Sequence, residues 1–188
     1  MAAAAESLRG ELLDHPVGDR REALSKEIML VELERLDRPF DRAADLTHVT
    51  ASAIVVGDRG VVLHRHRRLL RWMQPGGHLD PGETPAEAVI RECVEETGLE
   101  VAHPTSGPRM IHVDVHLAAL NHVHLDLRYL VGAPDEQPVP GPGESPDVAW
   151  FTWEDAAAIA DDALAGALRT ARRMIAGPGG RAIRGEGE

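Results

Sequence analysis

Three glutamates near the middle of the chain have the types and the spacing for metal-assisted phosphate chemistry. Glu92, Glu95 and Glu96 stand at positions i, i+3 and i+4, which share one face if the segment is helical. Like charges this close repel one another, and a cation among them would remove that cost. Mg²⁺ prefers hard oxygen ligands and is commonly shared between a few carboxylates and substrate phosphates. The alternative is a solvated acidic face, which glutamate-rich helices usually present.

A helix over residues 85–97 must position these carboxylates. Thr84, Pro85 and Glu87 have the spacing of a capping box with proline at the first helical position. Gly98 fits a left-handed C-cap. The apolar spacing predicts a buried stripe on the other side, consisting of Ala86, Ile90, Cys93 and Thr97 with Val89 and Val94 beside it.

The same segment matches a longer pattern of fixed positions. Gly77 is followed after five residues by Glu83, and after seven more by RECVEETGL, residues 91–99. This resembles the signature of the Nudix hydrolases, G-x5-E-x7-R-E-U-x-E-E-x-G-U, where U is a bulky aliphatic residue. Every charged and glycine position matches. Cys93 stands where an aliphatic residue is usual, and a buried free cysteine packs as a small hydrophobe.

The resemblance implies a fold, a reaction and a metal site. The fold class is α/β, a Nudix-type α/β/α sandwich with a mixed sheet. The reaction is hydrolysis of a diphosphate joined to another group X, with Mg²⁺ as cofactor and Mn²⁺ as its substitute. The implied metal ligands are the side chains of Glu92, Glu95 and Glu96 and the backbone carbonyl of Gly76.

The resemblance also implies a catalytic set of Glu95, Arg91 and Glu83. Glu95 is our choice of the base that activates water, and the alternatives are another glutamate of the motif or a carboxylate outside it. Glu83 and Arg91 are expected to pair and to brace the loop against the helix. Metal ions and positioned charge would do most of the work, as is usual in phosphoryl transfer.

Two predicted neighbouring strands carry a second set of titratable side chains, which are His112, Asp114 and His116 on one and His122, His124 and Asp126 on the other. Strand alternation places each trio on one face, and a hairpin would bring the trios together. Three interpretations stay open: a transition-metal site, a substrate pocket, or a polar face exposed to water. From this set we assign to substrate binding Asp114, His116, His122 and His124.

A basic stretch, HRHRR at residues 64–68, precedes the motif. Alternation separates Arg65 and Arg67 from the other three side chains. We predict that Arg65 and Arg67 reach the substrate phosphates, and an exposed strand end is the alternative. His78, in the loop of the motif, joins the predicted substrate-binding residues.

Composition limits the partners of the chain. It has 188 residues, 43% of them hydrophobic, which is enough for one substantial core. A net charge of −11 argues against a nucleic-acid polymer as the main partner. Aromatic residues make up only 3%, so base stacking cannot be widespread. A small diphosphate is the expected substrate, since local arginines and Mg²⁺ can bind it on an acidic protein.

The single cysteine excludes an internal disulfide and fits a reducing cytoplasm. No apolar run has the length of a signal-peptide core or a transmembrane segment, so we predict a cytoplasmic protein without membrane contact.

Three segments are expected along the chain: a helical extension over residues 1–46, a Nudix domain over 47–176 and a disordered tail over 177–188. In the extension, Asp19 is the expected N-cap of a helix that runs to about Leu36. Leu24, Ile28 and Val31 lie along one side of it. This extension is expected to cover a sheet edge or to build a homodimer.

Within the domain, strands are predicted over residues 48–56, 61–66, 70–74, 109–117, 123–131 and 148–152. An Ala-rich helical region follows over residues 153–175, with a break near Asp161. Residues 133–147, rich in Pro and Gly, are predicted to form a surface loop. This loop and the histidine-rich strands are the expected determinants of substrate choice.

The predicted function is hydrolysis of a nucleoside diphosphate linked to a moiety X, such as a nucleotide or a sugar. Two other functions are alternatives. A non-catalytic Nudix-fold ligand-binding or regulatory module usually lacks glutamates of the signature, and all of them are present here. A diphosphate isomerase on this fold needs a catalytic cysteine outside the helix, and Cys93 is predicted to face the core.

Overall fold

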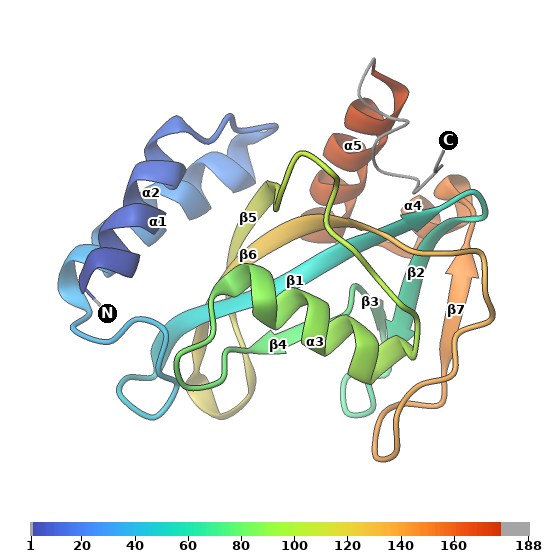
Figure 1. The fold of residues 1–188 in the computed structure, drawn as a ribbon. Helices are drawn as coiled ribbons and strands as arrows, with labels where there is room; N and C mark the ends of the chain where they lie inside the picture. The colour runs from blue at the N-terminus through green and yellow to red at the C-terminus, as the bar shows by residue number, and fades with distance from the viewer. Residues whose placement is uncertain (1, 178–188) are drawn as a thin grey trace.

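The computed structural model describes residues 2–177, which form a mixed sheet with helices on both of its faces (Figure 1). The strands are β1 (Thr47–Gly57), β2 (Gly60–Arg65), β3 (Trp72–Met73), β4 (Gly76–His78), β5 (Met110–Leu117), β6 (Val123–Gly132) and β7 (Val148–Phe151). The helices are α1 (Ala2–Asp14), α2 (Arg20–Arg35), α3 (Pro85–Thr97), η1 (Ala119–Asn121), α4 (Trp153–Ile159) and α5 (Asp162–Ala176).

The sheet is built around β1. The strand order is β3-β2-β1-β6-β5, with β4 also paired to β1 and β7 to β2. β1 and β6 run parallel from the pair Thr47–Val123 to the pair Val56–Gly132, whereas the other pairings are antiparallel. Because β4 and β2 share one side of β1, the strand that begins the motif lies directly against the centre of the sheet.

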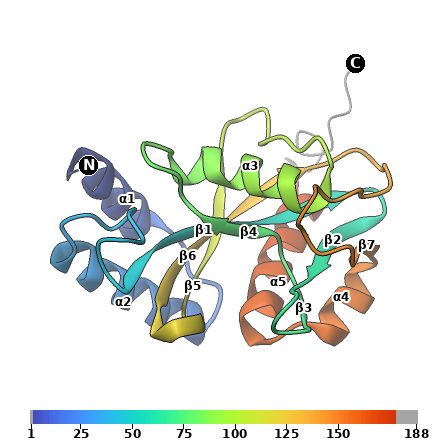
Figure 2. The ribbon, with the colours of Figure 1, turned by 90° about the horizontal axis from the view of Figure 1, so that it is seen from below.

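Alternation along β1 supplies both cores. Val49 and Ala51 belong to the core that includes Val89 of α3, while Ile54 belongs to the core that includes Leu164 of α5. Figure 2 shows α3 above the sheet and α4 and α5 below it. The predicted α/β/α sandwich with a mixed sheet is therefore confirmed.

The N-terminal helices lie beside the outer strand β5. The backbone N–H of Val113 donates to Glu22 Oε1 at 3.3 Å, and that of Val115 donates to Ser25 Oγ at 3.0 Å. An edge strand has unpaired backbone groups, and these two side chains satisfy some of them. The extension thus covers a sheet edge, one of its two expected roles.

The orientation of α2 differs from what its apolar spacing indicates. Leu24, Ile28 and Val31 are 50%, 45% and 64% exposed. The buried face instead consists of Glu22, Ser25, Met29 and Leu33. Hydrogen bonding to the edge of β5 decides which side of this helix turns inward.

Most other element boundaries agree with the sequence within two residues. Asp161 ends the first C-terminal helix region and caps α5, where its side chain accepts from the N–H of Leu164 at 2.9 Å. α1 and β4 were not predicted as separate elements. Residues 133–147 contain no helix or strand. The predicted disordered tail lies, from residue 178 onward, outside the described residues.

Over residues 2–177, none of the helices combines the length and the apolar character needed to cross a membrane.

Candidate active site

The helix α3 fixes the direction of the three glutamates. It begins with the predicted capping box of Thr84 and Glu87 and ends at Gly98, whose φ of 68° is left-handed. Cys93 is fully buried, so the helix is anchored by that side. The buried stripe differs from the prediction in part, because Ala88 belongs to it and Val94 is 44% exposed.

Arg91 holds the carboxylates and the preceding loop together. Its guanidinium donates to both oxygens of Glu83, at 2.9 and 2.8 Å, and to the carbonyl of His78 at 2.9 Å. It also donates to Glu92 at 2.9 Å and to Glu95 at 3.2 Å. Hydrogen bonds from Arg91 lower the pKa of the Glu83 carboxyl. The predicted pairing of Glu83 with Arg91 is therefore present, and Arg91 reaches further than predicted.

Glu96 is the most enclosed of the three glutamates. Its side chain is 13% exposed, and its Oε2 accepts from the N–H of Gly76 at 2.8 Å. Burial raises the pKa of Glu96 to about 8, and the nearby charges of Glu92, Glu144 and Glu95 add to this. The Glu92 pKa is also raised, chiefly by burial. A cation beside these two half-buried carboxylates would favour their ionised forms.

The space around Glu92 depends on a glycine. A Cβ on Gly77 would lie 2.6 Å from Glu92 Oε1, so only glycine lets the carboxylate lie against this backbone. Several carboxylates and a main-chain carbonyl are the hard oxygen donors that Mg²⁺ prefers. The residues present at Gly76, Glu92, Glu95 and Glu96 fit such an ion.

A polar network covers the sheet face opposite α3. Asp126 accepts from Thr50 at 3.1 Å, from Ser52 at 2.9 Å and from Arg128 at 2.9 Å. Burial alone would raise the pKa of Asp126, but the charge of Arg128 and these hydrogen bonds lower it. Nη1 of Arg128 is buried and has no hydrogen-bond partner among the described residues. A donor of this kind is free to bind an oxygen of a ligand.

Asp114 extends the network to the N-terminal extension. Arg21 of α2 donates to Asp114 at 2.7 Å, and His116 Nδ1 lies 3.0 Å from the same carboxylate. Burial opposes ionisation of Asp114, and hydrogen bonds from His116 and Arg21 overcome it, so its pKa lies well below the usual value.

The strands β5 and β6 bring the predicted histidines together. They pair antiparallel with Asp114 opposite Asp126 and His116 opposite His124. The ring of His124 lies 5.3 Å from that of His116 and 5.1 Å from that of His78, between ring centroids. The His122 ring lies 5.1 Å from His48, a residue that sequence reasoning did not select. His112 stands opposite Arg128 and is buried close to Gly166 of α5.

The two predicted arginine ligands lie elsewhere. Arg65 is 3.6 Å from Asp147 and donates to the carbonyl of Leu70 at 3.4 Å. Arg67 is exposed in the turn after β2. Neither contacts the glutamates of α3 in the part of the chain that the structure describes, and their role as phosphate ligands stays a prediction.

His64 and Glu144 were not selected from the sequence and lie near the glutamates. His64 Nδ1 is 3.5 Å from Glu96 Oε1, and burial lowers the pKa of its ring to about 4. Glu144, in the loop after β6, raises the pKa of both Glu92 and Glu96 by its charge. Strand alternation could have placed His64, but no sequence pattern locates Glu144.

A family model described as the NUDIX domain matches residues 46–173, well over half of the chain. The chain belongs to the Nudix family. Its Nudix signature, residues 77–99, contains α3. The region matched by the family model extends from the residue before β1 into α5. The predicted family is confirmed.

Individual relatives agree with this assignment. A solved hydrolase of the NUDIX family from Clostridium perfringens has 28% identity and a TM-score of 0.60, covering 68% of this chain and 97% of that one. The "Probable DHNTP pyrophosphohydrolase" of Lactococcus lactis is 26% identical over 141 residues, which cover 70% of this chain and 81% of that protein.

Matches over shorter stretches have a higher sequence identity. The Nudix hydrolase YvcI of Bacillus subtilis is 37% identical over 59 residues, which cover 31% of this chain. The chain spans 37% of the length of that relative, and 28% and 46% of the length of two further curated relatives.

Proposed function

We propose that this Nudix protein hydrolyses a diphosphate linkage in a nucleoside diphosphate joined to another moiety X, with Mg²⁺ as cofactor. The observation that carries the proposal is the anchoring of the three glutamates: Glu96 accepts from the N–H of Gly76, and Arg91 donates to both Glu92 and Glu95. Every charged and glycine position of the signature is filled, which favours an enzyme over a non-catalytic module of the same fold. The pyrophosphohydrolase among its relatives is consistent with this reaction class.

Glu92, Glu95, Glu96 and the carbonyl of Gly76 would hold the metal ions. When bound, Mg²⁺ would supply the positive charge that a diphosphate needs before a nucleophile can approach and the leaving phosphate can depart. Mn²⁺ has the same preference for oxygen ligands and would substitute.

Glu95 is the proposed general base. Its side chain is 51% exposed, against 16% for Glu92 and 13% for Glu96, so it is the glutamate that water and substrate reach most easily. Arg91 fixes its position from one side. Glu144 is the alternative base outside the motif, because its charge acts on the same carboxylates.

The network of Asp114, Asp126 and Arg128 is the proposed contact for the X group. It combines ionised acceptors with a buried unpartnered donor, a set suited to the hydroxyl and amide groups of a nucleotide or a sugar. We place His78, His116, His122 and His124 at its border. The substrate is a small molecule, and the free, buried Cys93 fits a reducing cytoplasm.

Two substitutions test the reaction. We expect Glu95→Gln and Glu96→Gln to lower Mg²⁺-dependent turnover roughly 100-fold or more, since each removes a charge from the site. The assay is release of phosphate products from nucleoside triphosphates, nucleotide sugars, dinucleotides and ADP-ribose, with Mg²⁺ or Mn²⁺. Glu100→Gln is the matched control, because Glu100 is an exposed glutamate just beyond the same helix.

Circular dichroism should show all three variants folded like the unmodified protein. If Glu95→Gln and Glu96→Gln retain full turnover, or if no diphosphate is cleaved with either metal, the proposal is wrong. An isomerase is disfavoured because burial raises the pKa of the Cys93 thiol and keeps it from reagents. Turnover that is insensitive to thiol alkylation and to Cys93→Ser agrees with hydrolysis.

A further inference from the structure

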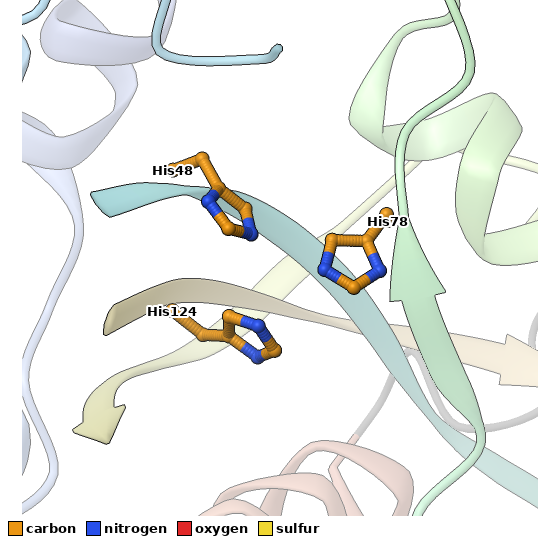
Figure 3. Close-up of side chains that lie close together, drawn as sticks. All are labelled: His48, His78 and His124. Carbon is orange, nitrogen blue, oxygen red and sulfur yellow. The ribbon is translucent and has the colours of Figure 1, made fainter. Parts of the chain in front are cut away.

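Three histidines from three strands meet beside the proposed active site. His48 belongs to β1, His78 to β4 and His124 to β6, and each pair of rings lies 5.1 Å apart between centroids. One nitrogen from each ring can be chosen so that the three lie within 4.8 Å of one another. Figure 3 shows the three rings turned toward a common space.

The sheet itself produces this arrangement. In the parallel β1–β6 pair, His48 is registered with His124, so both side chains leave the same face next to each other. In the antiparallel β1–β4 pair, His78 is registered with Thr50, which is two residues from His48 and on its face. The convergence is thus a property of strand register rather than of mobile loops.

His48 has the hydrogen-bonding pattern of a metal-ligating histidine. Its Nδ1 lies 3.3 Å from the backbone carbonyl of Asp45. A carbonyl can only accept, so Nδ1 carries the proton and Nε2 keeps its lone pair. That Nε2 is buried and has no hydrogen-bond partner among the described residues. Ligating histidines commonly donate their other ring N–H to a backbone carbonyl in this way.

We propose that His48, His78 and His124 form a binding site for a transition-metal ion of the Zn²⁺ class, separate from the glutamate site on α3. Three imidazole nitrogens are ligands typical of Zn²⁺, Co²⁺ or Ni²⁺, whereas Mg²⁺ prefers oxygen. His122 and His116 lie beside the trio, with ring centroids 5.1 Å from His48 and 5.3 Å from His124, and either could supply a fourth ligand.

Binding requires a small contraction of the site. Zn–N bonds of ~2.1 Å at tetrahedral angles place the nitrogens about 3.4 Å apart, so nitrogens that lie within 4.8 Å of one another must approach by up to about 1.4 Å. Arg42 opposes binding, because its Nη1 lies 3.5 Å from Nδ1 of His78. Asp126 favours binding, because its negative charge acts on His124.

The site would be tied to the active site through its backbone. The carbonyl of His78 accepts from Arg91, the residue that holds Glu83, Glu92 and Glu95. A metal ion on the His78 ring would therefore fix the strand from which the carboxylate site is built.

The test is direct metal binding by the full-length protein, measured without substrate. Protein stripped with a chelator is titrated with Zn²⁺ against a chromophoric competitor, and with Co²⁺ followed by its visible absorption. We expect one equivalent to bind in a Glu95→Gln/Glu96→Gln background. We expect His78→Ala and His124→Gln each to weaken binding by more than the ~10–100-fold that loss of a supporting hydrogen bond costs.

His103→Gln is the control, because His103 is a half-buried histidine that bonds the carbonyl of Ala86 and lies outside the cluster. Circular dichroism identifies any variant that fails to fold, and two histidine variants are included so that one folded variant suffices. Zn²⁺ binding that is unchanged in the folded histidine variants, or that disappears in the glutamate background, overturns the proposal. Because no hydrolysis is measured, failure of the proposed reaction would not produce either result.

Discussion

His112 is a buried imidazole whose position opposes protonation of its ring. It is 1% exposed, and neither ring nitrogen has a hydrogen-bond partner among the described residues. A Cβ on Gly166 would lie 2.7 Å from its Nε2, so α5 closes directly over the ring. Burial, assisted by the charge of Arg128, lowers the pKa of His112 from 6.5 to about 4.

This shift predicts acid sensitivity of the folded state. The unfolded chain binds a proton at His112 near pH 6.5, whereas the folded protein does so only near pH 4, so stability is lost as the pH falls through this range. The loss due to His112 is on the order of 3 kcal/mol. We expect His112→Leu to reduce the difference in unfolding free energy between pH 7 and pH 4.5, measured by urea denaturation. An equal difference in the variant and the unmodified protein would contradict this assignment.

At the residue scale, contacts within the motif are the ones that can be predicted from the sequence. Helix spacing predicts that Cys93 faces the core, and the resemblance to the Nudix signature predicts the pairing of Glu83 with Arg91. His48 and Glu144 were not predicted, because their proximity to the site follows from strand register and from the path of a loop. Such contacts join residues far apart in the chain, and no local spacing encodes them.

At the scale of elements, α2 lies along the edge of β5 where a further strand could pair, and its side chains accept hydrogen bonds from the backbone of β5. Glu22 is buried and accepts from the His15 ring at 2.8 Å, from the N–H of Gly18 at 2.6 Å and from the N–H of Val113 on β5. Burial opposes its ionisation, and the hydrogen bonds from His15 and Gly18 lower its pKa. One carboxylate therefore joins the loop before α2 to the edge of the sheet.

Removal of this carboxylate should loosen the extension. We expect Glu22→Ala to lower the unfolding free energy by about 3 kcal/mol, because it leaves a buried imidazole and two N–H groups without their acceptor. Glu27→Ala on the exposed side of the same helix is the control, with an expected change below about 0.5 kcal/mol. Equal unfolding midpoints for the two variants in urea would show that the edge contact does not stabilise the fold.

The elements also show where apolar spacing does not identify the buried side of a helix. The boundaries of α3 and the break at Asp161 were predicted because capping residues mark them. The exposed stripe of Leu24, Ile28 and Val31 was not predicted, because apolar spacing usually indicates the buried side. Here the polar edge of β5 selects the other face of the helix.

At the scale of the whole molecule, the chain is acidic, and the glutamates of α3 are a place where a cation would stabilise the fold. The net charge is −11, and burial raises the pKa of both Glu92 and Glu96. A ligand that binds only the folded state adds to its stability, by ~2.7 kcal/mol at a hundred times its dissociation constant.

We therefore expect Mg²⁺ at that concentration to raise the melting temperature by roughly 5–10 °C, as expected for a chain of this size. Differential scanning calorimetry of protein treated with EDTA, before and after addition of Mg²⁺, measures the shift. The Glu95→Gln/Glu96→Gln variant should lose most of it. A shift that persists in this variant would place the stabilising ion elsewhere.

The parallel pairing of β1 with β6 sets the order in which the protein can assemble. Each residue of β1 meets a partner 76 positions later, as in the pair Thr50–Asp126. Closing so long a loop lowers the chain entropy before the stabilising contacts of the strand pair form, so we expect this pairing to form slowly. A ribosome has already made α3 and its glutamates while β6 is still unsynthesised. The polar network of Asp114, Asp126 and Arg128 therefore forms only after β6 has been synthesised. A shorter nascent chain contains the motif without this network.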